Sequence, residues 1–124
     1  MKDINDIKQL LRDFANERDW DQFHSPKNLS MALMAEAGEL LEHFQWLSEE
    51  QSRQLDPDTR EQVAQEIADV QIYLVRLADK LDIDILDAVS HKLTINSQKY
   101  PAQQVRGSAD KYTAYQKQKK TSEE

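Results

Sequence analysis

The scarcity of glycine and proline is the feature that most restricts how this sequence can fold. The chain has two glycines and three prolines among its 124 residues. Sandwiches and barrels need many tight turns, and these two residue types supply most of the backbone conformations that such turns require. The only glycines, Gly38 and Gly107, are too few and too far apart to form a glycine-rich phosphate loop of the P-loop or dinucleotide-binding type. The sequence therefore predicts an all-α protein built from long helices.

The prolines indicate where these helices begin and end. Ser25-Pro26 and Asp56-Pro57 each pair a capping residue with a proline suited to the first helical turn, whereas Pro101 ends the helix before it. We expect helices over residues 3–18, 26–47, 57–81 and 83–99. Residues 1–104 are predicted to form a single domain, followed by a polar, flexible tail over residues 105–124.

The predicted third helix is apolar on two faces. One seam, expected to face the core of a four-helix bundle, consists of Val63, Ile67, Val70, Leu74, Leu77 and Leu81. The opposite side carries Ala64, Ala68, Ile72 and Val75. A chain of this size has little material to cover both faces, so we expect a second subunit to cover one of them in a homodimer or homotetramer. The alternative is a central helix wrapped by the other three.

Paired acids interrupt the apolar stripes of the second and third helices. Glu36 falls near the centre of a leucine-rich stripe, and Glu39 follows one turn later on the same side. Glu66 and Asp69 repeat this spacing beside the seam of the third helix. Neighbouring carboxylates at a buried edge destabilise a helix unless a positive group lies between them. If the two helices pack antiparallel, all four acids meet.

Such a cluster predicts a metal site with coordination positions left for substrate phosphates. Oxygen ligands alone favour a hard cation, so Mg²⁺ is expected, with Mn²⁺ as a substitute. Iron is disfavoured because neither pair has the Glu-x-x-His pattern of di-iron bundles. The alternative is that these are ordinary acidic pairs on solvated helix faces.

Aromatic and polar side chains near the acids are candidates for substrate binding. Trp20, Trp46 and Tyr73 can form a slot for a nucleobase, although each alone also suits a helix end or a core. Lys92, Asn96 and Tyr100 lie along one face of the fourth predicted helix and can reach phosphate and sugar, unless Lys92 extends to solvent and Asn96 ends the helix.

Charge and composition restrict the possible binding partners and the cellular location of the protein. The net charge of −7 disfavours a nucleic-acid polymer as partner. We find no apolar run long enough to span a membrane and no signal-peptide core. The absence of cysteine removes thiol chemistry and fits a reducing compartment, so we expect a cytoplasmic protein.

Four segments resemble one known family. Residues 18–29, 36–46, 66–74 and 92–101 are similar to the motifs of the MazG-like all-α nucleoside triphosphate pyrophosphohydrolases, within their dCTP pyrophosphatase branch. The chain departs from some members at Leu11, where they have a histidine.

The resemblance implies an activity and roles for particular residues. It implies hydrolysis of a nucleoside triphosphate, with dCTP or a modified dCTP expected, to the monophosphate and pyrophosphate. It implies that Glu36, Glu39, Glu66 and Asp69 ligate Mg²⁺ and form the catalytic site, with Glu39 as the first candidate to orient or deprotonate water. It also implies that base, sugar and phosphate are bound by Trp20, Gln22, His24, Trp46, Tyr73, Lys92, Asn96 and Tyr100.

Two other functions stay open at this point. One is a related pyrophosphatase acting on another nucleotide, such as dUTP or a damaged dNTP. The other is a non-catalytic helical module whose acidic cluster binds metal only to hold subunits together.

Overall fold

The computed structural model describes residues 1–109, which form helices and no strand. In chain order the elements are α1 (Ile4–Glu17), the 3₁₀ turn η1 (Asp21–Phe23), α2 (Pro26–Glu42), α3 (Glu49–Ser52), α4 (Pro57–Lys80), α5 (Ile85–Lys99) and α6 (Ala102–Val105). The prediction of an all-α fold is confirmed. The chain divides into two compact units, residues 1–84 and residues from 85 onward, and each is described by itself. The single domain over 1–104 stays a prediction, and most of the proposed tail lies outside the described residues.

The two longest helices, α2 and α4, begin at the prolines, as predicted from the sequence. The Ser25 hydroxyl accepts a hydrogen bond from the Asn28 backbone N–H at 3.1 Å, which caps α2. The Asp56 carboxylate caps α4 in the same way through the Thr59 N–H at 2.8 Å. These caps satisfy backbone donors that the first helical turn leaves without partners.

The second helix is shorter than the expected 26–47. It ends at Glu42, and the next residues form turns in which the Leu47 N–H donates to the Phe44 carbonyl at 2.9 Å. Ser48 then starts α3 through a reciprocal capping box with Gln51. Apolar spacing alone could not show this break, because Phe44 and Leu47 continue the helical stripe in the sequence. The other boundaries differ from expectation by one or two residues.

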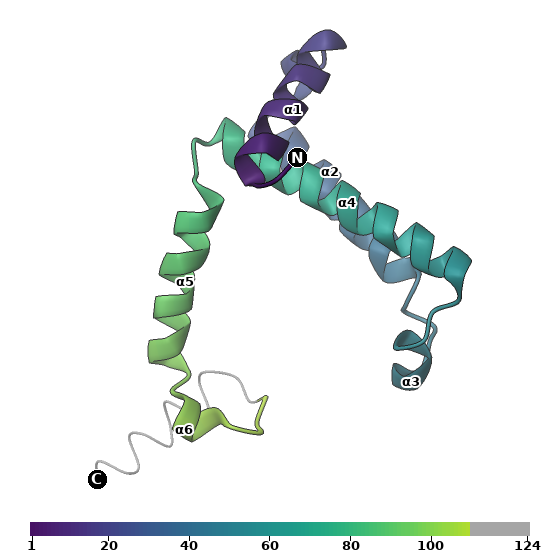
Figure 1. The fold of residues 1–124 in the computed structure, drawn as a ribbon, viewed down its shortest axis with the longest axis vertical. Helices are drawn as coiled ribbons and strands as arrows, with labels where there is room; N and C mark the ends of the chain where they lie inside the picture. The colour runs from purple at the N-terminus through teal and green to yellow at the C-terminus, as the bar shows by residue number, and fades with distance from the viewer. Residues whose placement is uncertain (110–124) are drawn as a thin grey trace. The chain divides into compact units, whose positions relative to one another are not determined.

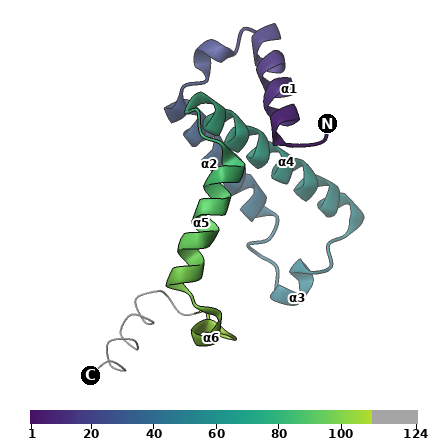
Figure 2. The same cartoon turned by 60° about the vertical axis from the view of Figure 1, so that its left-hand side comes forward.

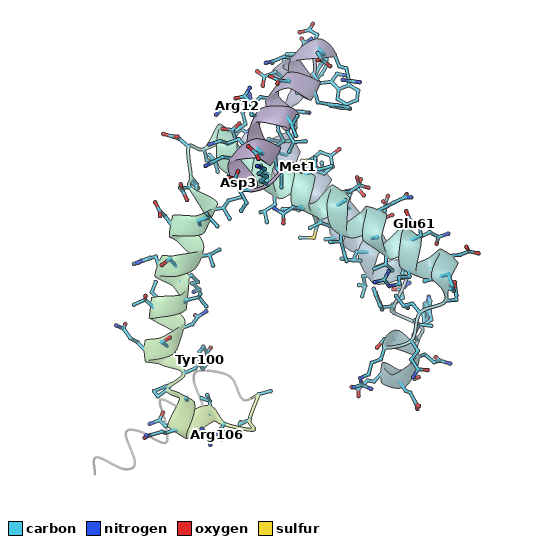
Figure 3. All side chains as sticks on the ribbon, in the orientation of Figure 1. Met1, Asp3, Arg12, Glu61, Tyr100 and Arg106 are labelled. Atoms are coloured by element: carbon cyan, nitrogen blue, oxygen red, sulfur yellow. The ribbon has the colours of Figure 1, made fainter. Side chains whose placement is uncertain are left out.

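In the first unit, α2 and α4 run antiparallel and side by side, joined by the segment that contains α3 (Figures 1 and 2). The first helix packs against α4. Arg12 on α1 lies beside the C-terminal half of α4, whereas Glu61 lies toward the opposite end of that helix (Figure 3). The antiparallel pair is what brings the two acidic motifs to the same level.

Few apolar side chains of the described residues are fully buried. Leu29 on α2 and Val75 on α4 are each 1% exposed. The expectation that the whole seam of α4 faces the core is wrong for Ile67, Leu74 and Leu81, which are exposed, because α1 and α2 cover only part of this 24-residue helix. Much apolar surface of the first unit is therefore uncovered in the single chain.

The second unit consists of α5 and the short helix α6 over its described part. The Tyr100 N–H donates to the Asn96 carbonyl at 2.8 Å, and Pro101 then ends the run as predicted. No helix within residues 1–109 is long and apolar enough to cross a bilayer.

Candidate metal centre and adjoining cavity

Three of the four predicted acids converge between α2 and α4. Glu36 and Glu39 project from α2, and Glu66 projects from α4 toward them. Each offers a carboxyl oxygen that lies within 4.8 Å of the oxygens offered by the other two. Residues three apart share a helix face, and the antiparallel packing of the two helices places the two motifs opposite each other. The described residues thus contain a group of acids suited to hold a metal ion.

The electrostatics of this cluster are unfavourable without a cation. Glu36 and Glu66 each have an Oε2 atom that is buried and has no hydrogen-bond partner within the described part of the chain. Burial, which has the largest effect, and the nearby carboxyl groups of Glu39, Glu66 and Asp69 together raise the pKa of Glu36 to about 7. A hard divalent cation with oxygen ligands would satisfy both the orphaned oxygens and the mutual repulsion.

Asp69 is placed differently from the other three acids. It is half-buried on α4 and close enough for its charge to act on Glu36, but it is not one of the three residues whose oxygens converge. It lines an adjoining cavity instead. Metal ligation by Asp69 stays a prediction, and its position links the acidic cluster to that cavity.

The adjoining cavity has a volume of about 230 Å³ and is mostly apolar. Its walls are Leu11, Phe14, Ala15, Trp20, His24, Asp69, Ile72, Tyr73 and Arg76. The Phe14 and Trp20 rings meet edge to face with centroids 5.8 Å apart. Three predicted binding residues, Trp20, His24 and Tyr73, therefore line one cavity, next to an acid of the predicted metal site.

Other predicted binding residues do not line this cavity. The Gln22 side-chain amide donates instead to the backbone carbonyl and the carboxylate of Asp19, each at 3.0 Å. Trp46 lies in the turns after α2 and is 86% exposed. The remaining three, Lys92, Asn96 and Tyr100, belong to the second unit, so their roles stay predictions.

Arg76 was not predicted from the sequence as a site residue, and it is 4% exposed although charged. Its Nη2 donates to the Asp21 carboxylate at 2.9 Å and lies 3.2 Å from Nδ1 of His24. Its Nη1 lies 3.7 Å from Asp79 Oδ2. A signal was present, because Arg76 follows Asp69 and Tyr73 by seven and three residues, which places all three on one face of α4.

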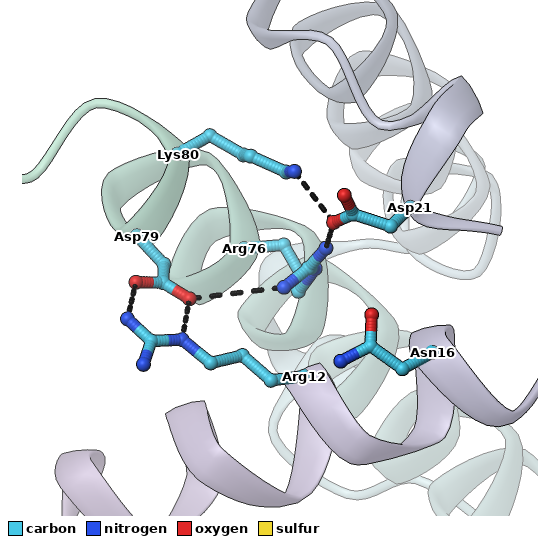
Figure 4. A pocket seen from close by; sticks show the side chains of 6 residues that line it. All are labelled: Arg12, Asn16, Asp21, Arg76, Asp79 and Lys80. Atoms are coloured by element: carbon cyan, nitrogen blue, oxygen red, sulfur yellow. Dashed lines mark hydrogen bonds and ion pairs between the residues drawn. The ribbon is translucent and has the colours of Figure 1, made fainter. Parts of the chain in front are cut away.

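Arg76 also lines a second, polar cavity of about 340 Å³ (Figure 4). Arg12 forms a bidentate ion pair with Asp79 at 2.5 and 2.6 Å, and Lys80 pairs with Asp21 at 2.5 Å. Hydrogen bonds from Lys80 and Arg76 lower the pKa of Asp21, and those from Arg12 lower the pKa of Asp79. Each charged group of the network has at least one oppositely charged partner, which indicates a structural role in joining α1 and η1 to α4.

Comparison with known proteins identifies the family. Residues 31–114, which include both acidic motifs, match the MazG-like family. The chain belongs to the MazG-like family. The family resemblance noted in the sequence is thereby confirmed, and the all-α architecture agrees with it.

Proteins similar to this chain include pyrophosphatases. The chain is 46% identical over 112 residues to dCTP pyrophosphatase 1 of Mus musculus and of Homo sapiens, which covers 89% of this chain and 66% of each relative. The matched region thus spans just under two thirds of these proteins. A crystal structure of a pyrophosphatase from Archaeoglobus fulgidus superposes with a TM-score of 0.74 and 39% identity, covering 78% of this chain and 91% of that one.

Proposed function

We propose that this protein is a metal-dependent pyrophosphohydrolase of deoxynucleoside triphosphates, with dCTP or a modified dCTP as its substrate. The observation that carries the proposal is the carboxylate cluster of Glu36, Glu39 and Glu66 beside an apolar, aromatic-lined cavity, with Asp69 between them. Binding of a triphosphate requires a cation, and binding of a nucleobase requires an apolar slot. In this structure the candidate cation site and the apolar cavity are adjacent. The dCTP pyrophosphatases among the relatives support cytosine as the base.

Glu36, Glu39, Glu66 and Asp69 are proposed to hold Mg²⁺, for which Mn²⁺ can substitute. The oxygen-only donor set and the buried, unpartnered oxygens of Glu36 and Glu66 fit such an ion. When bound, the ion supplies positive charge that neutralises the triphosphate and the leaving group.

The exposed Glu39 is the proposed residue that orients or deprotonates the attacking water. The oxygen of water forms a bond to phosphorus while the bond between phosphorus and the bridging α,β-oxygen breaks. The water proton passes to the carboxylate, and the products are the nucleoside monophosphate and pyrophosphate.

The base is proposed to enter the apolar cavity and stack on the aromatic walls formed by Trp20 and Tyr73. Lys92, Asn96 and Tyr100 on the second unit are proposed to bind phosphate and sugar. Gln22 in η1, His24 directly after it and the exposed Trp46 are proposed as further substrate contacts.

A homo-oligomer is proposed as the active assembly. Exposed apolar side chains on α2 and α4 include Met31 at 61%, Met34 at 71%, Leu41 at 58% and Ile67 at 55%. Exposed apolar surface on this scale is typical of protein interfaces. Light scattering on the protein as it elutes from a size-exclusion column should give the mass of a dimer or tetramer. A monomer at micromolar concentration would contradict the proposal.

A cytoplasmic location and the lack of a nucleic-acid partner are also proposed, on the basis of composition and charge.

One experiment tests the activity and its alternatives. The full-length protein is incubated with Mg²⁺ and each of dCTP, 5-methyl-dCTP, dUTP, dTTP, dATP and dGTP, and pyrophosphate release is measured. We expect release that is fastest from the cytosine nucleotides and is abolished by a chelator. Preference for another nucleotide would identify a related pyrophosphatase, and no release from any of them would favour the non-catalytic module.

A further inference from the structure

The contact between Arg76 and His24 decides which hydrogen-bonding group the apolar cavity presents. His24 lines the cavity, and its Nδ1 lies 3.2 Å from Nη2 of the buried Arg76. A guanidinium carries only donors and keeps its charge in proteins. Nδ1 must therefore be the acceptor in this contact, and the ring proton of neutral His24 must be on Nε2.

Other groups around His24 strengthen this arrangement. Burial lowers the pKa of His24, and the charge of Arg76 lowers it further, with a smaller effect of Lys80, while Asp21 acts in the opposite direction. A protonated imidazole would also place its Nδ1–H against the guanidinium donor. The ring is therefore held neutral and in one tautomer near pH 7.

Arg76 itself cannot rotate freely to release this contact. Its Nη2 is held by Asp21 and its Nη1 faces Asp79, which is bound in turn by Arg12 (Figure 4). The orientation of the guanidinium is thus set by two carboxylates, one at each terminal nitrogen. Second partners of this kind fix the tautomer of functional histidines in other sites.

We propose that Arg76 is a positioning residue that holds His24 as the Nε2–H tautomer, so that His24 donates a hydrogen bond to N3 of a cytosine ring in the apolar cavity. No hydrogen bond to Nε2 is made by any side chain or backbone group within residues 1–109, which leaves this donor for a ligand. N3 of cytosine accepts a hydrogen bond, whereas N3 of uracil and thymine carries a proton. A fixed donor therefore favours cytosine and opposes the other two pyrimidines.

The cavity size agrees with a single-ring ligand. Its volume of about 230 Å³ is below the roughly 300–1,000 Å³ typical of sites for drug-sized ligands. It suits a base with the sugar and phosphates outside, toward Asp69 and the acidic cluster. This inference rests on the proposed function, because it names the residue that gives the same site its preference for cytosine.

The tautomer can be measured without any nucleotide. The chain has three histidines, so ¹⁵N-histidine labelling and long-range ¹H–¹⁵N correlation at pH 8 resolve each ring, and His43 and His91 serve as internal references. We expect a protonated Nε2 and an unprotonated Nδ1 for His24 in the wild type. In Arg76→Met we expect a mixture of tautomers and a raised His24 pKa. A wild-type His24 protonated on Nδ1 would overturn the proposal, whether or not the variant folds.

Lys80→Met is the matched control, because Lys80 also binds Asp21 at 2.5 Å but makes no hydrogen bond to His24. It should leave the tautomer unchanged. If Lys80→Met disturbs His24 as much as Arg76→Met does, the effect comes from Asp21 and not from Arg76, and the proposal is wrong.

Base selectivity gives the second readout. The ratio of kcat/KM for dCTP to that for dUTP should fall about tenfold in Arg76→Met, mainly through KM for dCTP, as expected for one lost hydrogen bond. His24→Gln, which carries an amide donor near the Nε2 position, should keep most of the ratio, and His24→Asn, which does not reach that far, should lose it. Equal ratios in these two variants would overturn the proposal.

Absence of any turnover in the wild type would instead reject the proposed function. The tautomer of His24 would still be tested by the NMR measurement, which needs no nucleotide.

Discussion

Glu36 on α2 and Glu66 on α4 approach within 4.8 Å through their carboxyl oxygens, and each has one oxygen buried without a partner. Burying two acids from different helices together is costly unless a cation or a proton neutralises part of their charge. The pair is therefore the most direct structural sign of a cation site, and the first predictions concern it.

Glu36→Gln should abolish turnover while the fold is kept. The amide has nearly the same shape but carries no charge, so we expect activity to fall by at least about 100-fold. The metal-free variant should melt no lower than the wild type, because the repulsion with Glu39 and Glu66 is removed. Glu61→Gln is the control and should be fully active, because Glu61 is an exposed acid on α4 outside the acidic cluster. Full activity of Glu36→Gln would exclude Glu36 from the site.

Metal-free stability should fall as the pH rises from about 4.5 to about 7. Glu36 has its pKa raised from an ordinary 4.5 to about 7, so within this window the folded state holds a proton that the unfolded state has lost. Unfolding in urea with a chelator should therefore become easier with rising pH, relative to Glu36→Gln measured in parallel. Added Mg²⁺ should remove the difference at pH 8. Parallel pH profiles of the two proteins without metal would contradict the raised pKa.

Trp20→Leu should weaken binding of the nucleotide more than it slows the reaction. Stacking of one base on an aromatic ring contributes about 1–3 kcal/mol, so KM for dCTP should rise about tenfold or more while kcat changes little. Phe23→Leu is a suitable control, because Phe23 lies in η1, is 60% exposed and does not line the cavity. A larger effect from Phe23 than from Trp20 would place the base elsewhere.

Asp79→Asn should destabilise the fold by about 2–3 kcal/mol. The Asp79 side chain is 8% exposed and carries the bidentate pair with Arg12, so the substitution leaves two guanidinium groups short of an acceptor charge. Urea unfolding measures the change. Arg53→Gln breaks a 4.0 Å pair between exposed side chains and should cost less than about 0.5 kcal/mol. Equal effects would show that the network around Asp79 contributes no more than a surface pair.

The acidic motifs and their helices could be predicted from the sequence because the spacing of residues along a helix is a local property. Glu36 and Glu39 share a face by 3.6-residue periodicity alone, and Ser25-Pro26 and Asp56-Pro57 mark helix starts through local hydrogen bonds. The small number of glycines and prolines was enough to exclude a β fold. The end of α2 was misplaced because the apolar stripe continues through Phe44 and Leu47 while the backbone turns.

The tertiary structure alone decided which side chains share an environment. Arg76 and His24 are far apart in the sequence, and their contact depends on how η1 packs against α4, which no periodicity encodes. The same holds for Asp69, whose place at the cavity wall and not among the three converging oxygens is set by the packing of α1 and α2 on α4. Local hydrogen bonding and helical spacing thus determine the elements, whereas the burial, pKa and partners of each charged group depend on neighbours that only packing brings together.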